Sequence, residues 1–463
     1  MIRHVFNCIF FIPQKRRYEN VKAIFYLARH KAKGRYNIAM QKLVAIDLPG
    51  GEQFSLITKK CFEHNDAVLP LDQRLSQTAK ENLVKLFRPH CIVSYPGKKN
   101  PFDSTGSTFP EHQSGNCSLR DTETINLADG VTMQEGDALV MPTSGTTGIP
   151  KGVVLTLEAL QASAAATNEY LDVNTSSDKW LCCLPLGHIG GFSVMTRGIL
   201  TSTPTVIIPK FETKTVLELI EREHVTLTSL VTTTLNMLGG NASLLRKILL
   251  GGSKAPENTP DNVVKTYGMT ETASGVVYDG NILSGMEIAF RDPGNQLSAP
   301  DKTLPEGEIC LRGKMLFRNY RLAAEDPKIN GWFPTGDAGR LNKEGRLEVD
   351  GRIAEMIITG GENVWPSQVE NIISKAKNVS EVVVAGLDDE KWGQKVVAFI
   401  VPIDRGAILE TAKINETIKE TIGPWAVPKD FYLMNEIPKT AIGKPIKSQL
   451  LKEMHHAELP AKF

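Results

Sequence analysis

The segment from Met141 to Val154, with the sequence MPTSGTTGIPKGVV, combines the residue types that bind a polyphosphate. It follows a predicted buried strand and precedes a predicted helix. Its glycines let the backbone approach a ligand and expose amide groups, while hydroxyls and the Lys151 ammonium add donors and positive charge. A Walker loop has the pattern G-x-x-x-x-G-K-[ST]. Starting at Gly145, it would need Gly at position 150, which is Pro, and Ser or Thr at position 152, which is Gly, so it is excluded. A flexible surface loop is the alternative, but the Pro-Lys-Gly ending between apolar runs favours phosphate binding.

Five further motifs follow this loop along the chain. They are Gly251-Gly252-Ser253, the run YGMTE from Tyr267 to Glu271, the run GWFPTGD from Gly331 to Asp337, Gly351-Arg352 with TGGE at 359–362, and PKTAIGK at 438–444. In this order, the motifs resemble those of the adenylate-forming enzymes, a family of acyl- and aryl-CoA synthetases, luciferases and peptide-synthetase adenylation domains. The resemblance extends from Leu43 to Leu451. It implies an enzyme that joins a carboxylic acid to a thiol through an acyl-adenylate, with ATP, Mg²⁺ and coenzyme A as cofactor and co-substrates.

The resemblance assigns the nucleotide contacts. The phosphate loop would hold the β- and γ-phosphates through Thr143, Ser144, Gly145, Thr146, Thr147, Gly148 and Lys151. The adenine would lie between Gly251, Gly252 and Ser253 on one side and Tyr267 and Gly268 on the other. Thr270 would donate to the α-phosphate, and Glu271 with Thr147 would bind Mg²⁺ through the hard oxygen ligands that this ion prefers.

The resemblance also implies the catalytic residue and the ribose contacts. Asp337 would accept both ribose hydroxyls, and Arg352 would reach the ribose or a phosphate. Lys444 would bridge the attacking carboxylate and the α-phosphate as negative charge redistributes, which makes it the principal catalytic residue. Without their motifs, Asp337 would be read as a turn former and Lys444 as a surface lysine.

The acceptor half-reaction would use a second face of the C-terminal part. The resemblance implies that this part swings about a joint near Asp350–Ala354 and replaces Lys444 with Gly360, Gly361 and Glu362, whose small residues let the pantetheine arm pass. Trp392 either contacts the CoA nucleotide or is a core residue. Ala354 departs from the acidic or basic residue that many relatives carry at this pivot.

The acyl pocket is expected around the run PLGHIGGFSVMTRG. Its candidate residues are His188, Gly191, Phe192, Arg197, Thr232 and Met269, with His188 closing the pocket or sensing the carboxylate. No acid lies near Phe192 to bind an ammonium group, which disfavours an amino acid. Arg197 lies on a predicted apolar helix, and a buried arginine there requires an anion. Either a second substrate carboxylate or a structural salt bridge would supply it.

This run also resembles the o-succinylbenzoate:CoA ligases of menaquinone biosynthesis, whose substrate is a dicarboxylate. Alternatives are a fatty or aryl acid:CoA ligase, a ligase for a carrier protein, and a catalytically silent nucleotide-binding regulator. The presence of Glu271, Asp337, Arg352 and Lys444 argues against the silent regulator.

Strands and helices alternate around these motifs. Strands are expected at Leu43–Asp47, Ala67–Pro70 and Cys91–Ser94, separated by helices, which predicts a parallel sheet with crossover helices. Shorter strands at Leu227–Val231, Lys247–Leu250 and Glu308–Arg312 suggest a β-rich subdomain. The expected fold class is α/β, with a large N-terminal domain of αβ-layered sheets and a β-rich subdomain, joined by a hinge to a small α+β C-terminal domain. The expected boundaries are a basic arm at 1–40, the adenylation domain at 41–350 and a mobile domain at 351–463.

Composition sets the remaining limits. The chain has 463 residues and a net charge of +1, which gives no reason to expect nucleic acid as a partner. Its seven cysteines show no CxxC pattern, as in a reduced, cytoplasmic protein. Residues 1–40 hold nine Lys and Arg and only one acidic residue. Three interpretations of this segment remain open: a packed basic helix, an extension of the core or a weak membrane-surface contact. The apolar stretch Val5–Ile12 is too short to span a bilayer. A homodimer is also left open.

Overall fold

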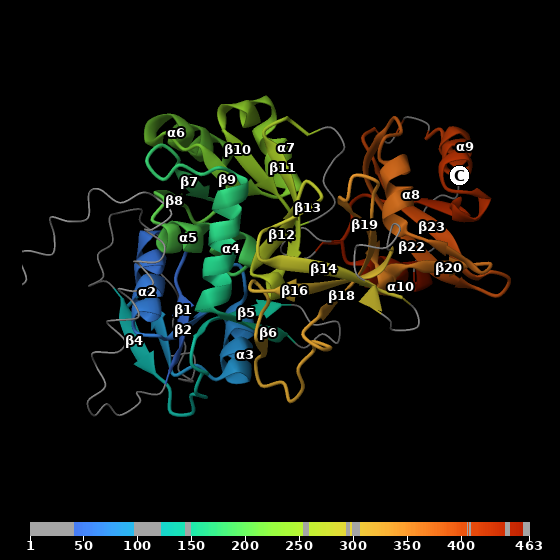
Figure 1. The fold of residues 1–463 in the computed structure, drawn as a ribbon. Coiled ribbons are helices and arrows are strands. Elements are labelled where there is room, and N and C mark those ends of the chain that lie inside the picture. Colours follow the sequence, from blue (N-terminus) through green and yellow to red (C-terminus); the bar gives the residue numbers. More distant parts are fainter. Residues whose placement is uncertain are drawn as a thin grey trace, which may run out of the picture. The chain divides into compact units, whose positions relative to one another are not determined.

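The computed structural model describes residues 41–96, 122–143, 150–252, 259–292, 297–298, 306–404, 406, 409–439 and 445–456. The basic arm predicted for residues 1–40 lies outside these ranges. From Lys42 onward the chain forms one compact unit. The expected α/β class is confirmed, because helices alternate with parallel strands in two of the sheets (Figure 1).

The first sheet has the strand order β17-β6-β5-β2-β1-β3-β4. Its strands are β1 (Leu43–Asp47), β2 (Ala67–Pro70), β3 (Cys91–Ser94), β4 (Glu123–Asn126), β5 (Asp137–Thr143), β6 (Lys151–Thr156) and β17 (Asn319–Tyr320). β1, β2, β3 and β5 run parallel, with α2 (Glu52–Glu63) and α3 (Gln77–Phe87) as crossover helices. Every residue of β1, β2 and β3 is buried, as expected for strands covered on both faces. The three predicted strands are confirmed at their predicted bounds.

The second sheet has the order β13-β12-β11-β10-β9-β7-β8. Its strands are β7 (Trp180–Cys182), β8 (Thr205–Ile207), β9 (Leu227–Leu230), β10 (Lys247–Leu250), β11 (Val263–Met269), β12 (Ser274–Tyr278) and β13 (Asn281–Ile282). Helices α5 (Ile189–Thr201), α6 (Thr213–Glu223) and α7 (Thr232–Leu238) connect the parallel strands. The assignment of Leu227–Val231 and Lys247–Leu250 to a β-rich subdomain was wrong, because β9 and β10 are parallel neighbours in this sheet. Only short helical turns separate them, which hides the crossover in the sequence.

Helix α4 (Leu157–Tyr170) packs against α5 and contacts strands of both seven-stranded sheets (Figure 1). Its buried face is made of small residues, including Ala159, Ser163 and Ala164, which allow close approach. The Thr156 side chain caps the helix by accepting a hydrogen bond from Ala159 N at 3.1 Å. The helix predicted after the segment Met141–Val154 is confirmed as α4. A strand that was not predicted, β6, lies between the loop and this helix and pairs antiparallel with β5.

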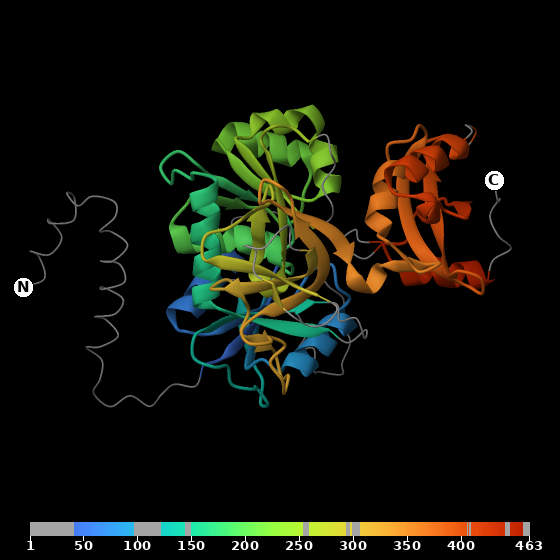
Figure 2. The same ribbon diagram turned by 45° about the vertical axis from the view of Figure 1, so that its right-hand side comes forward.

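The third sheet is antiparallel and confirms the β-rich part predicted around Glu308–Arg312. Its strands are β14 (Met286–Arg291), β15 (Leu297–Ser298), β16 (Glu306–Gly313), β18 (Phe333–Leu341) and β19 (Leu347–Arg352), in the order β15-β14-β16-β18-β19 (Figure 2). β18 and β19 pair in a register that sets Asp337 opposite Arg352. The pairing therefore brings together two residues that the sequence placed in separate motifs.

The C-terminal elements form a fourth sheet with a core on each face. Its strands are β20 (Ile357–Thr359), β21 (Glu362–Val364), β22 (Val379–Asp389), β23 (Gly393–Pro402) and β24 (Asp430–Leu433). Along β23, Val396 and Ala398 face a core with α8 (Pro366–Ile373) and α9 (Thr411–Thr421), whereas Phe399 faces a core with α10 (Lys447–His456). This alternation is the period-2 pattern of a strand buried on both sides. In the described residues, no helix is long and apolar enough to cross a membrane.

Candidate functional site

The described ends of the phosphate loop lie on paired strands. Thr143 ends β5 and Lys151 begins β6, and the Thr143 hydroxyl donates to the Lys151 carbonyl at 3.3 Å. Gly152 has a packing reason to be glycine, because a Cβ there would lie 2.7 Å from Phe87 and 3.0 Å from Arg321. Ser144, Gly145, Thr146, Thr147 and Gly148 lie outside the described residues.

A sharp chain reversal from β11 through η4 (Thr270–Thr272) into β12 carries most of the candidate residues. Gly268 is required here, because a Cβ would lie 2.1 Å from the Ser274 carbonyl oxygen. The Thr272 hydroxyl accepts a hydrogen bond from Met269 N at 2.9 Å and fixes the turn. The reversal thus presents Tyr267, Glu271 and Ser274 within eight residues of chain.

Tyr267, Asp337 and Arg352 form a directly bonded group. The Tyr267 hydroxyl donates to Asp337 Oδ2 at 2.9 Å, and Arg352 Nε lies 3.0 Å from Asp337 Oδ1. Burial and the Asp337 carboxylate raise the pKa of Tyr267 well above its ordinary value, so the phenol stays a donor. Asp337 is only 6% exposed. An ionised carboxylate has about four lone-pair sites, which suits it to accept hydroxyl hydrogen bonds.

A second group joins Glu271 to the phosphate loop through Tyr320, a residue that the sequence analysis did not single out. The Tyr320 hydroxyl donates to Glu271 Oε1 at 3.0 Å, and Lys151 Nζ lies 4.8 Å from the centroid of the Tyr320 ring. Thr270 lies beside Glu271 in η4 and is half-buried. The structure therefore brings the predicted metal ligand and the predicted phosphate cation to one side chain.

The adenine candidates and one acyl-pocket candidate follow the carboxyl ends of parallel strands. Gly251 and Gly252, the adenine candidates, follow β10. Thr232, the acyl-pocket candidate, begins α7 one residue after β9. Such ends share one edge of the sheet, which is the usual place for ligands in α/β folds. Gly252 has a φ of +87°, a conformation that favours glycine, and a Cβ on Gly251 would lie 2.7 Å from Thr266 Oγ1. Ser253 lies outside the described residues.

Arg197 is buried on α5, with 2% of its surface exposed. Its guanidinium donates to Ser229 Oγ and Ser274 Oγ, both at 3.4 Å, and lies 5.1 Å from the centroid of the Trp180 ring. Within the described residues it forms no ion pair, and its Nε has no hydrogen-bond partner. Burial lowers the pKa of Arg197 from its ordinary value. The structural salt bridge considered as the alternative is therefore absent from the described part of the chain.

Ser274 is strained as well as polar. Its φ is +135°, outside the range that residues with a side chain normally adopt, and its hydroxyl accepts hydrogen bonds from Arg197 and from Ser193 at 3.2 Å. Strain of this kind persists where the surrounding structure imposes it and is concentrated at functional sites.

His188 lies at the start of α5 and is held by an acid. Its Nε2 lies 3.1 Å from Asp72 Oδ2, and Arg74 binds the same carboxylate through Nε and Nη2. Burial acts to raise the pKa of Asp72, but hydrogen bonds from His188 and Arg74 outweigh it and hold the pKa well below its ordinary value. For two neighbouring candidates, packing in the core explains why the residue type is present. Phe192 is wholly buried in the core, and a Cβ on Gly191 would lie 2.4 Å from the Pro185 carbonyl oxygen.

The C-terminal candidates lie at a hairpin turn. Gly360 and Gly361 join β20 to β21 with positive φ values of 61° and 87°, as a two-residue type I′ turn requires, and Glu362 is exposed after them. The Gly360 amide donates to the carbonyl of Trp392 at 2.8 Å. Trp392 is 40% exposed, so the prediction of a core residue was wrong. Ala354 lies in the turn η5 (Ile353–Glu355), and Lys444 lies outside the described residues.

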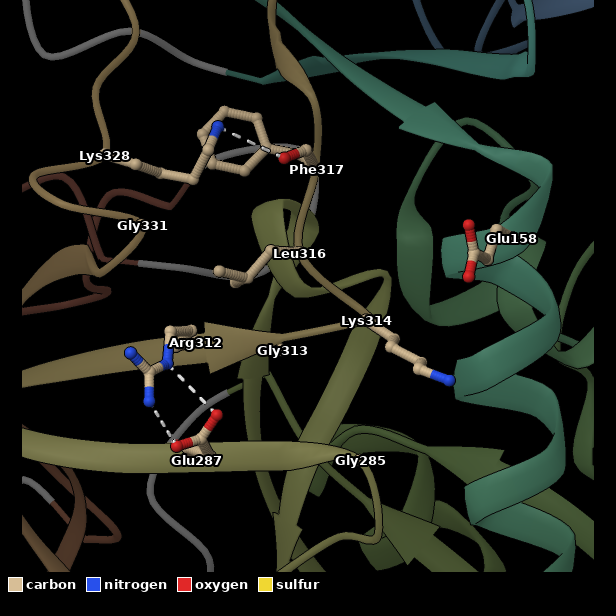
Figure 3. A pocket seen from close by; sticks show the side chains of 10 residues that line it. All are labelled: Glu158, Gly285, Glu287, Arg312, Gly313, Lys314, Leu316, Phe317, Lys328 and Gly331. Atoms are coloured by element: carbon tan, nitrogen blue, oxygen red, sulfur yellow. Dashed lines mark hydrogen bonds and ion pairs between the residues drawn. The ribbon is translucent and has the colours of Figure 1, made fainter.

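A surface pocket of about 580 Å³ lies elsewhere, between α4 and the strands β14 and β16 (Figure 3). An ion pair between Arg312 and Glu287 forms part of its wall, and Lys328 donates to the carbonyl of Phe317 at 3.4 Å. None of the predicted site residues lines it. We therefore place the candidate site at the Tyr267–Ser274 reversal and not in this pocket.

Sequence reasoning missed Tyr320, Asp72 and Arg74. Tyr320 lies 49 residues after Glu271, and Asp72 lies 116 residues before His188, so no local spacing connects them. Ser274 lay within the range 267–276 expected to line the acyl pocket, three residues after the YGMTE motif, but was not singled out.

Comparisons with known proteins identify the family of this chain. The family model described as AMP-binding enzyme matches residues 36–321, and that of the AMP-binding enzyme C-terminal domain matches residues 368–444. A 2-succinylbenzoate–CoA ligase of Listeria monocytogenes is 36% identical over 341 residues, covering 69% of this chain and 70% of the relative. An indoleacetate–CoA ligase of Aromatoleum aromaticum is 35% identical over 343 residues, covering 67% and 66%. The structure of o-succinylbenzoate CoA synthetase from Bacillus subtilis with its acyl-adenylate OSB-AMP superposes with a TM-score of 0.75 at 27% identity, covering 92% and 90%. The chain belongs to the AMP-binding enzyme family.

Proposed function

We propose that this chain is an ATP-dependent 2-succinylbenzoate–CoA ligase. In the first step a substrate carboxylate oxygen attacks the α-phosphorus of ATP and pyrophosphate leaves, which gives the acyl-adenylate. In the second step the CoA thiolate attacks the acyl carbon, AMP leaves and the thioester forms. The observation that carries the choice of acid is Arg197, a buried cation without an ion pair in the described structure.

Arg197 suits a substrate with two carboxylates. One carboxylate must be consumed in adenylation, so only a diacid retains a negative charge for the guanidinium. Burying an unpaired cation costs free energy, and a bound carboxylate would recover part of that cost through charge-assisted hydrogen bonds. Ser193, Ser229 and Ser274 surround Arg197 with hydroxyls that can orient such a group. The relatives named 2-succinylbenzoate–CoA ligases support this acid.

The nucleotide contacts are proposed from the bonded groups. Asp337, which is held by a hydrogen bond from Tyr267 and an ion pair with Arg352, would accept hydrogen bonds from the ribose hydroxyls. Lys151 would neutralise phosphate charge. The donor chemistry of Glu271 fits Mg²⁺, which in nucleotide sites is held by one or two carboxylates together with phosphate oxygens, and the bound ion would neutralise charge on the phosphates. Lys444 would stabilise charge at the α-phosphate during adenylation.

Trp392 is a proposed contact for the CoA nucleotide. Its exposed ring has Lys391 Nζ at 4.9 Å and Lys429 Nζ at 5.4 Å from the centroid. An aromatic face can stack on a base, and neighbouring lysines can bind phosphate.

The proposal includes a domain boundary at 350/351 with a hinge near Asp350–Ala354. It also includes a cytoplasmic location, in keeping with unpaired cysteines at all five described positions.

A second candidate is an aryl acid:CoA ligase that acts on a monocarboxylate. The relative named indoleacetate–CoA ligase favours it. A panel of acids separates the two candidates: 2-succinylbenzoate, indoleacetate, benzoate, coumarate and fatty acids, each scored for AMP and CoA-thioester formation. Preference for 2-succinylbenzoate supports the proposal, preference for a monocarboxylate supports the second candidate, and no product with any acid refutes both.

A further inference from the structure

The chain segment from Phe317 to Arg321 connects two parts of the candidate nucleotide site. It pairs with β6, the strand that begins at Lys151: Arg318 N donates to Val154 O at 2.8 Å and Arg321 N donates to Gly152 O at 2.6 Å. At its other end, Phe317 N donates to the Glu271 carbonyl at 2.8 Å. The main chain of this segment therefore fixes the distance between β6 and the turn that carries Glu271.

The side chain of Tyr320 makes the same connection with opposite charges at its two ends. Its hydroxyl donates to Glu271 Oε1 at 3.0 Å, while its ring faces Lys151 Nζ at 4.8 Å from the centroid. The ring is braced by Phe317, with the two centroids 5.0 Å apart. One rigid side chain thus contacts both the cation and the carboxylate.

This arrangement gives Lys151 and Glu271 partners other than each other. Lys151 is exposed and Glu271 is half-buried, and the two opposite charges are brought to one side chain. A direct ion pair between them would reduce the charge available to a ligand on both sides. The phenol gives each residue a substitute partner: a hydrogen bond for the carboxylate and a π face for the ammonium.

We propose that Tyr320 is a positioning residue that keeps Glu271 and Lys151 from pairing with each other and aims the Glu271 carboxylate at the metal bound to the nucleotide. The proposal rests on the proposed function, in which both residues bind metal–ATP. Tyr320 itself touches no reacting atom in this scheme. Its contribution is to hold two charges in place before the nucleotide arrives.

The test separates the two ends of the side chain. Tyr320→Phe keeps the ring over Lys151 and removes the bond to Glu271, whereas Tyr320→Leu removes both contacts. Tyr170→Phe is the matched control, because the Tyr170 hydroxyl also donates to a carboxylate, Asp279 Oδ2 at 3.4 Å, outside the candidate site. Binding is measured without turnover: electron paramagnetic resonance follows free Mn²⁺ during titration with ATP, and a parallel titration measures ATP binding in EDTA.

Tyr320→Phe is expected to weaken Mn²⁺–ATP binding at least about tenfold, the change that follows from losing one hydrogen bond to a charged group. Metal-free ATP binding should change less than about threefold, because the ring still holds Lys151. Tyr320→Leu should weaken both, and Tyr170→Phe neither. Wild-type Mn²⁺–ATP affinity in Tyr320→Phe overturns the inference, as does an equal loss with and without metal.

The result is distinguishable from failure of the proposed function. If the wild-type protein forms no adenylate with any acid but Tyr320→Phe still loses Mn²⁺–ATP affinity selectively, the proposed function fails and the positioning role stands. If the wild-type protein is active and the variant binds Mn²⁺–ATP normally, only the positioning role fails. Thermal unfolding of both variants, compared with wild type, shows whether a change in binding reflects a change in fold.

Discussion

Replacing Arg197 by Met separates a functional arginine from a structural one, because the two roles predict different changes in stability. Methionine is similarly long and carries no charge. Replacing buried ionic groups with apolar residues is often neutral or stabilising by about 1–4 kcal/mol. The variant also loses the contact with Trp180, which is worth about 2 kcal/mol when desolvated. We therefore expect the free energy of unfolding to change by no more than about 2 kcal/mol in either direction.

The same substitution should impair a diacid selectively. A hydrogen bond to a charged group contributes about 1.5–3 kcal/mol, which corresponds to about a 10- to 150-fold loss in kcat/KM for 2-succinylbenzoate. Monocarboxylates make no such contact, so their kcat/KM should change less than about threefold. The assays are denaturant unfolding and steady-state thioester formation with both classes of acid.

Arg246→Met provides the contrast. Arg246 forms a bidentate pair with Asp178, which is 4% exposed, while the Arg246 side chain itself is 37% exposed. Removing the arginine leaves a buried carboxylate without its cation, and we expect a cost of about 3 kcal/mol, the low end for a broken buried pair. This variant should lose that stability and keep its preference among acids. If Arg197→Met loses as much stability and lowers kcat/KM equally for both classes of acid, Arg197 is structural and the reasoning fails.

Three other substitutions test separate parts of the site. Lys444→Ala should nearly abolish acid-dependent pyrophosphate exchange yet spare thioester formation from preformed acyl-adenylate, and equal loss in both assays would contradict its assigned role. Trp392→Ala should raise the KM for CoA about 5- to 150-fold, because about 1–3 kcal/mol of stacking is lost. Pyrophosphate exchange, which does not involve CoA, should be unchanged. An unchanged KM for CoA would show that Trp392 is not part of the CoA site. Asp72→Asn should lower the free energy of unfolding by about 1–3 kcal/mol at pH 7. Because the pKa of Asp72 in the folded protein is depressed, this difference should persist above its ordinary pKa of 3.8 and shrink as pH falls below that value. Chemical denaturation at several pH values measures the difference, and one that stays constant to pH 3 would show that the carboxylate charge is not what stabilises the fold.

The fold was predictable where hydrophobic pattern and strand length agree. The wholly buried strand Leu43–Asp47 is followed by the amphipathic helix α2, and Cys91–Ser94 is preceded by α3. Buried strands that alternate with such helices indicate a parallel sheet. β6 was missed because its apolar run merges with the start of α4, and only pairing with β5 identifies it as a strand. β9 and β10 were misassigned because their connections are short and helical propensity there is weak.

The site was predictable only where residues of one motif act together. The YGMTE motif predicted Tyr267 and Glu271 as parts of one site, and in the structure a local reversal carries both. Contacts between distant segments depend on sheet register, which no spacing reveals: Asp337 meets Arg352 through β18–β19 pairing, and Tyr320 meets Lys151 through β17–β6 pairing. The same limit applied to Arg197. Its helix was predicted from the sequence, but only the structure reveals that it forms no ion pair with the described residues.

The central claim is that this chain activates 2-succinylbenzoate as an adenylate, and detection of that intermediate tests it most directly. The purified protein is mixed with 2-succinylbenzoate, ATP and Mg²⁺ without CoA, quenched within a turnover and analysed by mass spectrometry. The account predicts 2-succinylbenzoyl-AMP and an equal amount of pyrophosphate, with the adenylate converted to the CoA thioester when CoA is added. Formation of ADP and phosphate, or no adenylate while a monocarboxylate gives one, would contradict it.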